Sequence, residues 1–317
     1  MAYRSGTPVE VLPRRTALLL VATFVMAALA GCAKDDGVGK ITGPYAVGTR
    51  SLDLVDKARP TPAFGDSPEL PTRTVTTDVW YPATGDPATP STPDVPAAKG
   101  PFPVIVFNHG QQGDPQQYTA TFEMWTRAGY VVAAPRHPLT VTGGPGGHFV
   151  DDIAGEVKDV GFVIDSLEGS LDDLVDLDHL GVAGHSSGAV AAYGTAYNTC
   201  CHSEQVDAVL VEGFPALVPI DDGTYAEDLK GTPLLMIHGT ADNEYPLAQA
   251  KTEYTAAKAP KFFMTIDGGN HSEDYRVGPK ATAAATAALA FFDFTLKDRD
   301  EARDSLLGTA GVEADAG

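Results

Sequence analysis

The sequence predicts an α/β fold in which helices flank a mainly parallel, twisted β-sheet. The first observation behind this prediction is that apolar runs of strand length alternate with helical patterns over residues 102–296, which is typical of strand–helix–strand crossovers. The second is that 317 residues with 43% hydrophobic content are enough to bury one large core. We therefore expect one folded domain over residues 73–297.

The individual elements follow from periodicity and from turn residues. Residues 73–83 alternate like a strand, whereas the proline-rich residues 84–103 indicate an exposed connection. Apolar runs predict further strands at 102–110, 130–138, 180–184, 206–213, 233–239 and 261–267. Helical patterns predict helices at 116–128, 153–167, 187–197, 247–257 and 281–296.

The segments outside this domain carry targeting and linker signals. Two arginines precede an apolar run at residues 17–30, which ends in a small-residue box before Cys32. This order is typical of an export signal over residues 1–31, and its ending resembles a bacterial lipoprotein signal in which Cys32 is lipidated; an ordinary secretory signal cut nearby is the alternative. We expect a flexible tether at 32–72 and an acidic, frayed tail at 298–317.

These signals predict an exported protein that is secreted or lipid-anchored at the extracytoplasmic face of a bacterial membrane. The net charge is −20 at pH 7, and loss of residues 1–31 makes it more negative. Such a surface repels phosphate backbones and anionic lipid headgroups. We therefore expect no nucleic-acid partner, and we expect membrane attachment to come from the lipid on Cys32. The sequence leaves the oligomeric state open.

The chain has two other cysteines, Cys200 and Cys201. An exported protein permits disulfides, but adjacent cysteines bridge only through a strained eight-membered ring. We therefore expect two buried thiols, with the vicinal disulfide as the alternative. No cysteine or histidine spacing indicates zinc, and we expect neither a metal nor an organic cofactor.

One pentapeptide carries a catalytic signature. Residues 184–188, Gly-His-Ser-Ser-Gly, match G-x-S-x-G and lie between an apolar strand and a helical pattern. In that context the serine stands on a strained strand-to-helix turn, and the glycines let strand and helix approach closely. We therefore predict Ser186 as a nucleophile. The amide of Ser187, at the start of the helix, is predicted to donate to a developing oxyanion.

A nucleophilic serine requires a base, and the base requires an acid that orients it. His271 follows the predicted strand at 261–267, and Asp242 follows the strand at 233–239. Nucleophile, acid and histidine then occur in the chain order of α/β-hydrolases. Glu212, at the end of another strand, is the alternative acid. We favour Asp242 because it is a short carboxylate in an open polar loop.

The loop after the strand at 102–110 is predicted to supply a second oxyanion donor, the amide of Gln111. His109 is expected to brace this loop. The connection at 214–232 is too short for a large cap domain, so an open cleft is expected. Candidate substrate contacts in that cleft are Gln112, His137, Phe214 and Tyr245.

Several motifs over residues 73–296, among them FPVIVFNHG, GHSSG, MIHGTADNEYP and GGNH, resemble one branch of the α/β-hydrolases. It contains bacterial platelet-activating-factor acetylhydrolase-like and dienelactone-hydrolase-like esterases. In the acetylhydrolases the acid occupies the position of Glu212, which is why that alternative is kept. Dienelactone hydrolases use a cysteine where this chain has Ser186, so that narrow activity is not expected.

The motifs together predict a serine carboxylic-ester hydrolase that acts on small or short-chain esters through an acyl-enzyme. A lipase or cutinase-like polyester hydrolase is the alternative within the same class. Those enzymes typically carry an aromatic residue in the oxyanion loop where this chain has Gln111. A non-catalytic surface binding protein on a hydrolase scaffold is the alternative from another class, and it predicts an incomplete triad.

Overall fold

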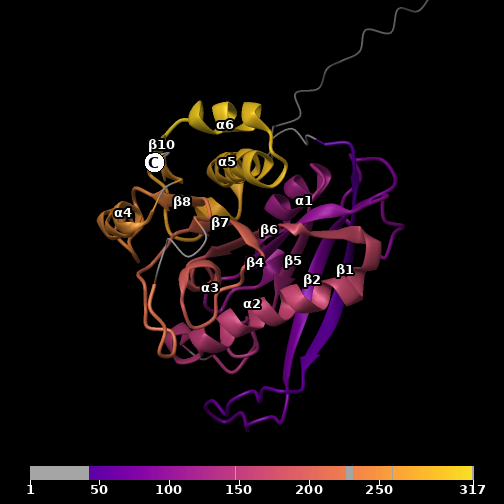
Figure 1. Ribbon diagram of the computed structural model, residues 1–317, viewed down its shortest axis with the longest axis vertical. Coiled ribbons are helices and arrows are strands. Elements are labelled where there is room, and N and C mark those ends of the chain that lie inside the picture. Colours follow the sequence, from indigo (N-terminus) through magenta and orange to yellow (C-terminus); the bar gives the residue numbers. More distant parts are fainter. Residues whose placement is uncertain (1–42, 147, 226–230, 259, 316–317) are drawn as a thin grey trace, which may run out of the picture. The chain divides into compact units, whose positions relative to one another are not determined.

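The computed structural model describes residues 43–146, 148–225, 231–258 and 260–315, which belong to one compact unit. Its centre is a sheet in the order β10-β9-β8-β7-β6-β4-β5-β2-β1-β3 (Figure 1). Strands β4 to β9 pair in parallel, whereas β1, β2 and β10 join the sheet through antiparallel pairing. The predicted α/β-hydrolase architecture, a mainly parallel sheet flanked by helices, is confirmed.

The bounds of the elements are as follows. The strands are β1 Ala46–Asp56, β2 Arg73–Ala83, β3 Thr92–Pro93, β4 Phe102–Asn108, β5 Val131–Pro135, β6 Val175–His185, β7 Val206–Glu212, β8 Leu234–Gly239, β9 Lys261–Ile266 and β10 Val312–Asp315. The helices are α1 Thr119–Arg127, α2 Phe149–Leu171, α3 Ser187–Tyr197, α4 Leu247–Ala256, α5 Gly278–Leu296 and α6 Asp300–Leu307. Single turns of 3-10 helix lie at η1 Pro115–Tyr118, η2 Asp172–Leu174 and η3 Glu273–Tyr275.

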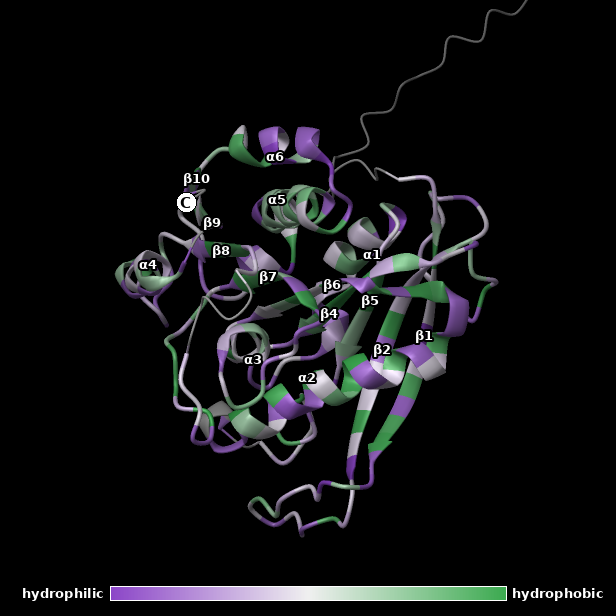
Figure 2. Cartoon of the chain, in the orientation of Figure 1, coloured by the Kyte–Doolittle hydropathy of each residue, from purple (hydrophilic) through white to green (hydrophobic). Residues whose placement is uncertain are grey.

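Two hydrophobic cores lie on the two faces of the sheet. Helices α2, α3 and α4 bury their apolar residues against one face, and α1, α5 and α6 cover the other (Figure 1). Helix α2 packs on the sheet because it is amphipathic. Hydrophobic and hydrophilic residues alternate along it in Figure 2, and its apolar side faces the core. The buried residues that the sequence pattern assigned to this side are Ile153, Val157, Val160, Ile164 and Leu167.

The prediction of a flexible tether over residues 32–72 is wrong for residues 46–56. Residues 46–56 form β1, which pairs along its whole length with β2. Alternate residues of β1 face solvent, so its apolar content is too low to stand out in the sequence. Thr77 of β2 pairs antiparallel with Pro135, the last residue of β5. The β1–β2 connection therefore emerges at the same edge of the sheet as the carboxyl ends of the parallel strands.

The prediction of a frayed tail after residue 297 is also wrong for the described part of it. Residues 300–307 form α6, which buries Ala302 and Leu306, and residues 312–315 add β10 to the edge of the sheet beside β9. The charged residues of this segment face outward around those two apolar anchors. A mostly polar segment is thus ordered by a small number of buried contacts.

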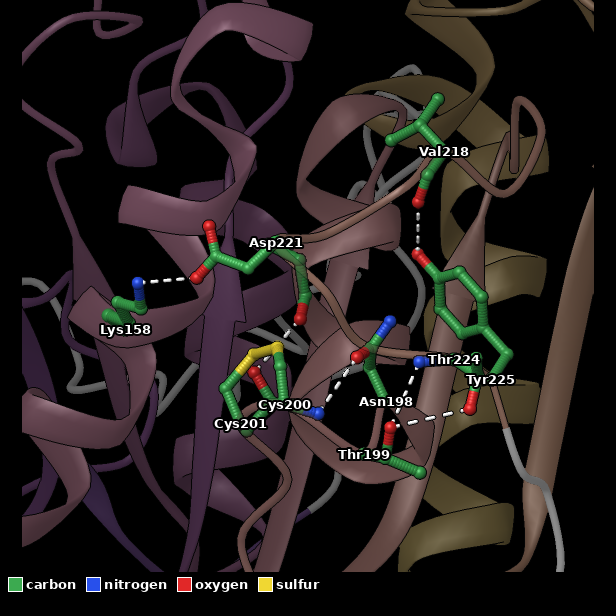
Figure 3. Close-up of a disulfide and its surroundings, with 11 residues drawn as sticks. Lys158, Asn198, Thr199, Cys200, Cys201, Val218, Asp221, Thr224 and Tyr225 are labelled. Atoms are coloured by element: carbon green, nitrogen blue, oxygen red, sulfur yellow. Dashed lines mark hydrogen bonds and ion pairs between the residues drawn. A yellow bond between two sulfur atoms is a disulfide. The ribbon is translucent and has the colours of Figure 1, made fainter.

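The two adjacent cysteines differ from the expected buried thiols. Cys200 and Cys201 are joined by a disulfide in the turn after α3, and Cys200 is exposed (Figure 3). The side chain of Asn198 accepts a hydrogen bond from the Cys200 amide (3.0 Å), and Thr199 contacts Thr224 across the turn (3.4 Å). The turn is therefore pinned to the connection that leads from β7 to β8.

The predicted signal peptide and Cys32 lie outside the described residues. Within the described ranges, no helix is long and apolar enough to cross a membrane. The described part of the β7–β8 connection contains no helix.

Candidate active site

Ser186 lies between the last residue of β6 and the first residue of α3. Its backbone has φ 56° and ψ −123°, a region that non-glycine residues rarely adopt. The flanking glycines allow this turn because a side chain at either would collide with backbone. A Cβ atom at Gly184 would lie 2.1 Å from the Gly188 carbonyl oxygen, and one at Gly188 would lie 2.1 Å from that of Asn108. The pentapeptide therefore forms the strained strand-to-helix turn that its sequence predicts.

Ser186, His271 and Asp242 form a continuous hydrogen-bonded chain. Nε2 of His271 lies 2.8 Å from Oγ of Ser186, and Nδ1 of the same ring lies 2.8 Å from Oδ2 of Asp242. The three residues follow β6, β8 and β9, which lie among four consecutive parallel strands of the sheet. Because the carboxyl ends of such strands share one edge, residues 85 positions apart in the chain meet there.

The carboxylate of Asp242 is fixed by its own loop. Its Oδ1 accepts hydrogen bonds from the amides of Glu244 (2.9 Å) and Tyr245 (2.8 Å), which leaves Oδ2 for His271. The Tyr245 ring packs edge-on against the imidazole, with ring centroids 5.0 Å apart. The aspartate and the tyrosine thus restrain the orientation of the imidazole from two sides.

Glu212, the alternative acid, is buried at the end of β7. Burial raises the pKa of its carboxyl group to about 8, so the group is largely protonated at neutral pH. The Glu212 backbone, in contrast, contacts the turn directly, because its carbonyl oxygen accepts from the Ser186 amide (2.9 Å). The geometry favours Asp242 as the partner of His271.

The sequence analysis did not identify His185 and Tyr118, which form a hydrogen-bonded chain to the backbone of His271. Nε2 of His185 lies 2.6 Å from the backbone oxygen of His271, and Nδ1 lies 2.8 Å from the hydroxyl of Tyr118. Since the carbonyl oxygen only accepts, Nε2 donates and Nδ1 accepts from the tyrosine. Burial and the neighbouring His271 lower the pKa of His185 to about 3, which keeps the ring neutral. The motif gives no signal for His185, because it occupies the first x of G-x-S-x-G, where any residue is allowed.

The loop after β4 lies against the serine, as the oxyanion prediction requires. A Cβ atom at Gly110 would lie 3.1 Å from Cβ of Ser186, so the backbone on the amino side of Gln111 passes close to the nucleophile. Ser187 is the first residue of α3, and the first amides of a helix have no acceptor within it. Both predicted donors therefore belong to segments that border Ser186.

The four candidate substrate contacts divide into two kinds. Gln112 is exposed and Tyr245 is partly exposed, so both remain accessible. His137 is completely buried and Phe214 is 1% exposed, so the prediction that these two contact substrate is wrong. Phe214 packs against Tyr193 in the core, with ring centroids 5.3 Å apart. Sequence position at a strand end does not distinguish a side chain that faces the cleft from one that faces inward.

A small polar cavity of about 270 Å³ opens beside His271. The residues that line it are Asn243, Glu244, Asn270, His271, Ser272 and Glu273. Among the residues that the structure describes, no group of three or more His, Cys, Asp or Glu side chains is arranged to hold a metal ion. At this edge of the sheet the hydroxyl of Ser186, the imidazole of His271 and the carboxylate of Asp242 meet.

Comparisons with known proteins identify the family. The family model described as chlorophyllase matches residues 69–239, which include Ser186 and end before Asp242 and His271. Among solved structures, a ferulic acid esterase from Streptomyces cinnamoneus has a TM-score of 0.65 and 21% sequence identity, over 83% of this chain and 93% of that chain. No curated protein matches. The chain therefore belongs to the chlorophyllase family and is a carboxylic-ester hydrolase with the α/β-hydrolase fold.

Proposed function

We propose that the protein hydrolyses small or short-chain carboxylic esters through a Ser186–His271–Asp242 triad and an acyl-enzyme. The observation that carries this proposal is the unbroken hydrogen-bonded chain from Asp242 through His271 to Oγ of Ser186. A non-catalytic binding protein on a hydrolase scaffold predicts an incomplete triad. The hydrogen bonds among these three side chains favour the enzyme instead.

The hydrogen bonds determine which way the proton moves. The carboxylate of Asp242 only accepts, so Nδ1 of His271 carries a hydrogen and Nε2 has a free lone pair. Nε2 then takes the hydroxyl proton as Oγ of Ser186 attacks the ester carbonyl carbon. The imidazolium returns this proton to the alcohol oxygen when the C–O bond breaks. Water, deprotonated by the same ring, then releases the acid from the acyl-enzyme.

The amides of Ser187 and Gln111 are the proposed donors to the tetrahedral oxyanion. The closeness of Gly110 to Ser186 and the position of Ser187 at the start of α3 support this assignment. Preorganised donors of this kind stabilise the charge that develops in the transition state, and they cost no reorganisation at that moment.

The cavity of about 270 Å³ beside His271 is where we propose that part of the ester lies. The narrower acetylhydrolase-like or dienelactone-hydrolase-like activity stays a prediction. We also propose that the protein is exported and anchored through a lipid on Cys32, which intact-mass measurement of the mature protein would test.

A panel of esters of graded acyl length, run beside Ser186→Ala, tests the activity. Turnover should fall by about 10⁶ in the variant, because no other group replaces the nucleophile. The panel should include chlorophyll and a ferulic acid ester, which the names of the family and of the fold neighbour suggest. Ester hydrolysis that persists in Ser186→Ala at the wild-type rate would overturn the proposal. Preference for long chains or polymer films would instead favour the lipase or polyester hydrolase alternative.

A further inference from the structure

His137, which lies in the loop after β5, connects the catalytic edge of the sheet to helix α2. Its side chain is completely buried. Its backbone amide donates to Nε2 of His109 (3.2 Å), in the loop after β4. The loop that carries Gln111 is therefore joined to the loop after β5 through His109 and His137. Neither histidine takes part in the hydrogen bonds of the triad given above.

Both ring nitrogens of His137 face groups that accept hydrogen bonds. Nδ1 lies 3.2 Å from a carboxylate oxygen of Asp159 on α2, and Nε2 lies 3.1 Å from Oδ1 of Asn108. The Asn108 amide cannot turn its NH₂ group toward the ring, because that group donates to the Ala183 carbonyl oxygen (3.0 Å). Both nitrogens must therefore carry a hydrogen, and the ring is a buried imidazolium.

Carboxyl groups near His137 stabilise the positive charge of its ring. Burial alone lowers the pKa of a histidine, but the charge of Glu156 and the hydrogen bond to Asp159 outweigh it, so the pKa of His137 is raised. His109 behaves in the opposite way. Burial and the nearby His137 lower its pKa to about 3, so it is neutral. Since its Nε2 accepts from the His137 amide, its Nδ1 donates to the carbonyl oxygen of Gly110 (2.8 Å).

The other side of Gln111 is anchored to the same helix. The amide of Gln112 donates to the Thr140 carbonyl oxygen (2.7 Å), and the Thr140 hydroxyl donates to Glu156 (2.5 Å). The Thr140 amide in turn donates to the carbonyl oxygen of His137 (3.2 Å). Gln111 thus sits between two neighbours, Gly110 and Gln112, that are both tied to carboxyl groups of α2.

One face of α2 carries these carboxyl groups. Asp152, Glu156 and Asp159 are spaced four and three residues apart, so their side chains point the same way. Arg73 of β2 donates to Asp152 (2.7 Å) and Asp159 (2.7 Å), and Arg59 of the β1–β2 connection donates to Asp159 (2.9 Å). Burial raises the pKa of Glu156 to about 7. These groups and neutral His109 are the charged and titratable side chains that face His137.

We propose that His137 is a positioning residue: a buried imidazolium that holds the Gln111 loop against Ser186 by linking it to the acidic face of α2. This inference rests on the proposed function, since Gln111 matters only if its amide meets an oxyanion. The charged ring joins Asn108, the last residue of β4, to Asp159 on α2, whereas a neutral ring could donate only one of these two hydrogen bonds.

The test compares His137→Gln with His179→Gln, a matched control. His179 also pairs through Nδ1 with an aspartate, Asp176 (2.9 Å), but it is partly exposed on β6. We expect His137→Gln to lower kcat per titrated active site by about 10²-fold with little change in KM, because an oxyanion contact is made in the transition state. Titration with a fluorophosphonate removes the effect of any unfolded fraction. His179→Gln should retain the wild-type kcat.

Wild-type protein labelled with ¹⁵N-histidine provides a second measurement, in which His137→Gln serves only to assign the signal. The spectrum should contain one ring that keeps both nitrogens protonated at pH 8, and His137→Gln should lose it. A neutral His137 ring at pH 8, or an unchanged kcat in His137→Gln, would overturn the inference. Activity that survives Ser186→Ala would instead defeat the proposed function itself, so the two failures are distinguishable.

Discussion

The buried pairs His271–Asp242 and His137–Asp159 differ in what the second ring nitrogen of the histidine meets. In His271–Asp242 that nitrogen faces the hydroxyl of Ser186 at 2.8 Å. In His137–Asp159 it faces an amide oxygen at 3.1 Å. A hydroxyl can give up a proton, whereas an amide oxygen only accepts one. The first ring is thus suited to act as a base, and the second is held as a cation.

The difference shows that a histidine–carboxylate contact alone does not indicate a catalytic base. Asp242 completes its hydrogen bonds with the amides of its own loop, so the pair is local and close to the cleft. Asp159 completes its hydrogen bonds with Arg73 and Arg59 from distant elements, so that pair joins α2 to the β1–β2 hairpin. We therefore expect the first pair to control turnover and the second to control stability and loop position.

Asp242→Asn should break the first pair and give the largest effect. Loss of the carboxylate favours the wrong tautomer of His271, and kcat should fall by about 10⁴. Steady-state kinetics on a short-chain ester measure this. Glu212→Gln is the matched control, because its protonated carboxyl already resembles an amide, and it should lower kcat less than tenfold. A small loss in Asp242→Asn with a large loss in Glu212→Gln would reverse the assignment of the acid.

Asp159→Asn should break the second pair with a different result. It leaves Arg73, Arg59 and His137 without a shared anion, and removal of one partner of a buried ion pair costs about 3–5 kcal/mol of unfolding free energy. Urea denaturation of wild type and variant measures the difference. Asp242→Asn should change the same quantity less, because its partners are two amides of its own loop and one imidazole rather than two arginines. Equal destabilisation by the two variants would contradict this division of roles.

The pH dependence of stability should report the buried acid Glu212. Its pKa is about 8 in the folded protein and 4.5 for an ordinary glutamate, so the folded state holds more protons between these values. The contribution of Glu212 to the free energy of unfolding is therefore fully present below pH 4.5 and is lost as the pH rises toward 8. The melting temperature should fall between pH 5 and pH 8.5 by about 5 °C more in wild type than in Glu212→Gln. Identical slopes would show that Glu212 is ionised in the folded protein.

Most of the parallel sheet could be predicted from sequence because its strands are buried on both faces. Strand β8 is a continuous apolar run, and helix α3 begins and ends at the predicted residues. Strand β1 could not be predicted, because only its pairing with β2 makes its alternating polar residues part of a sheet.

The disulfide between Cys200 and Cys201 was the less expected alternative. The turn that contains it depends on contacts with Thr224 and Tyr225, which lie far from it in the sequence.

The sequence by itself determined the fold class, the strained turn at Ser186 and the chain order of the groups that follow it. These depend on local pattern: apolar periodicity, glycines where backbones touch, and polar residues directly after strands. The tertiary structure places Asp242, and not Glu212, within hydrogen-bond distance of His271, and it buries His137, which the sequence offered as a substrate contact. Whether a carboxyl or an imidazole is charged depends on its burial and on the acceptors around it, and those partners lie up to about a hundred residues away in the chain.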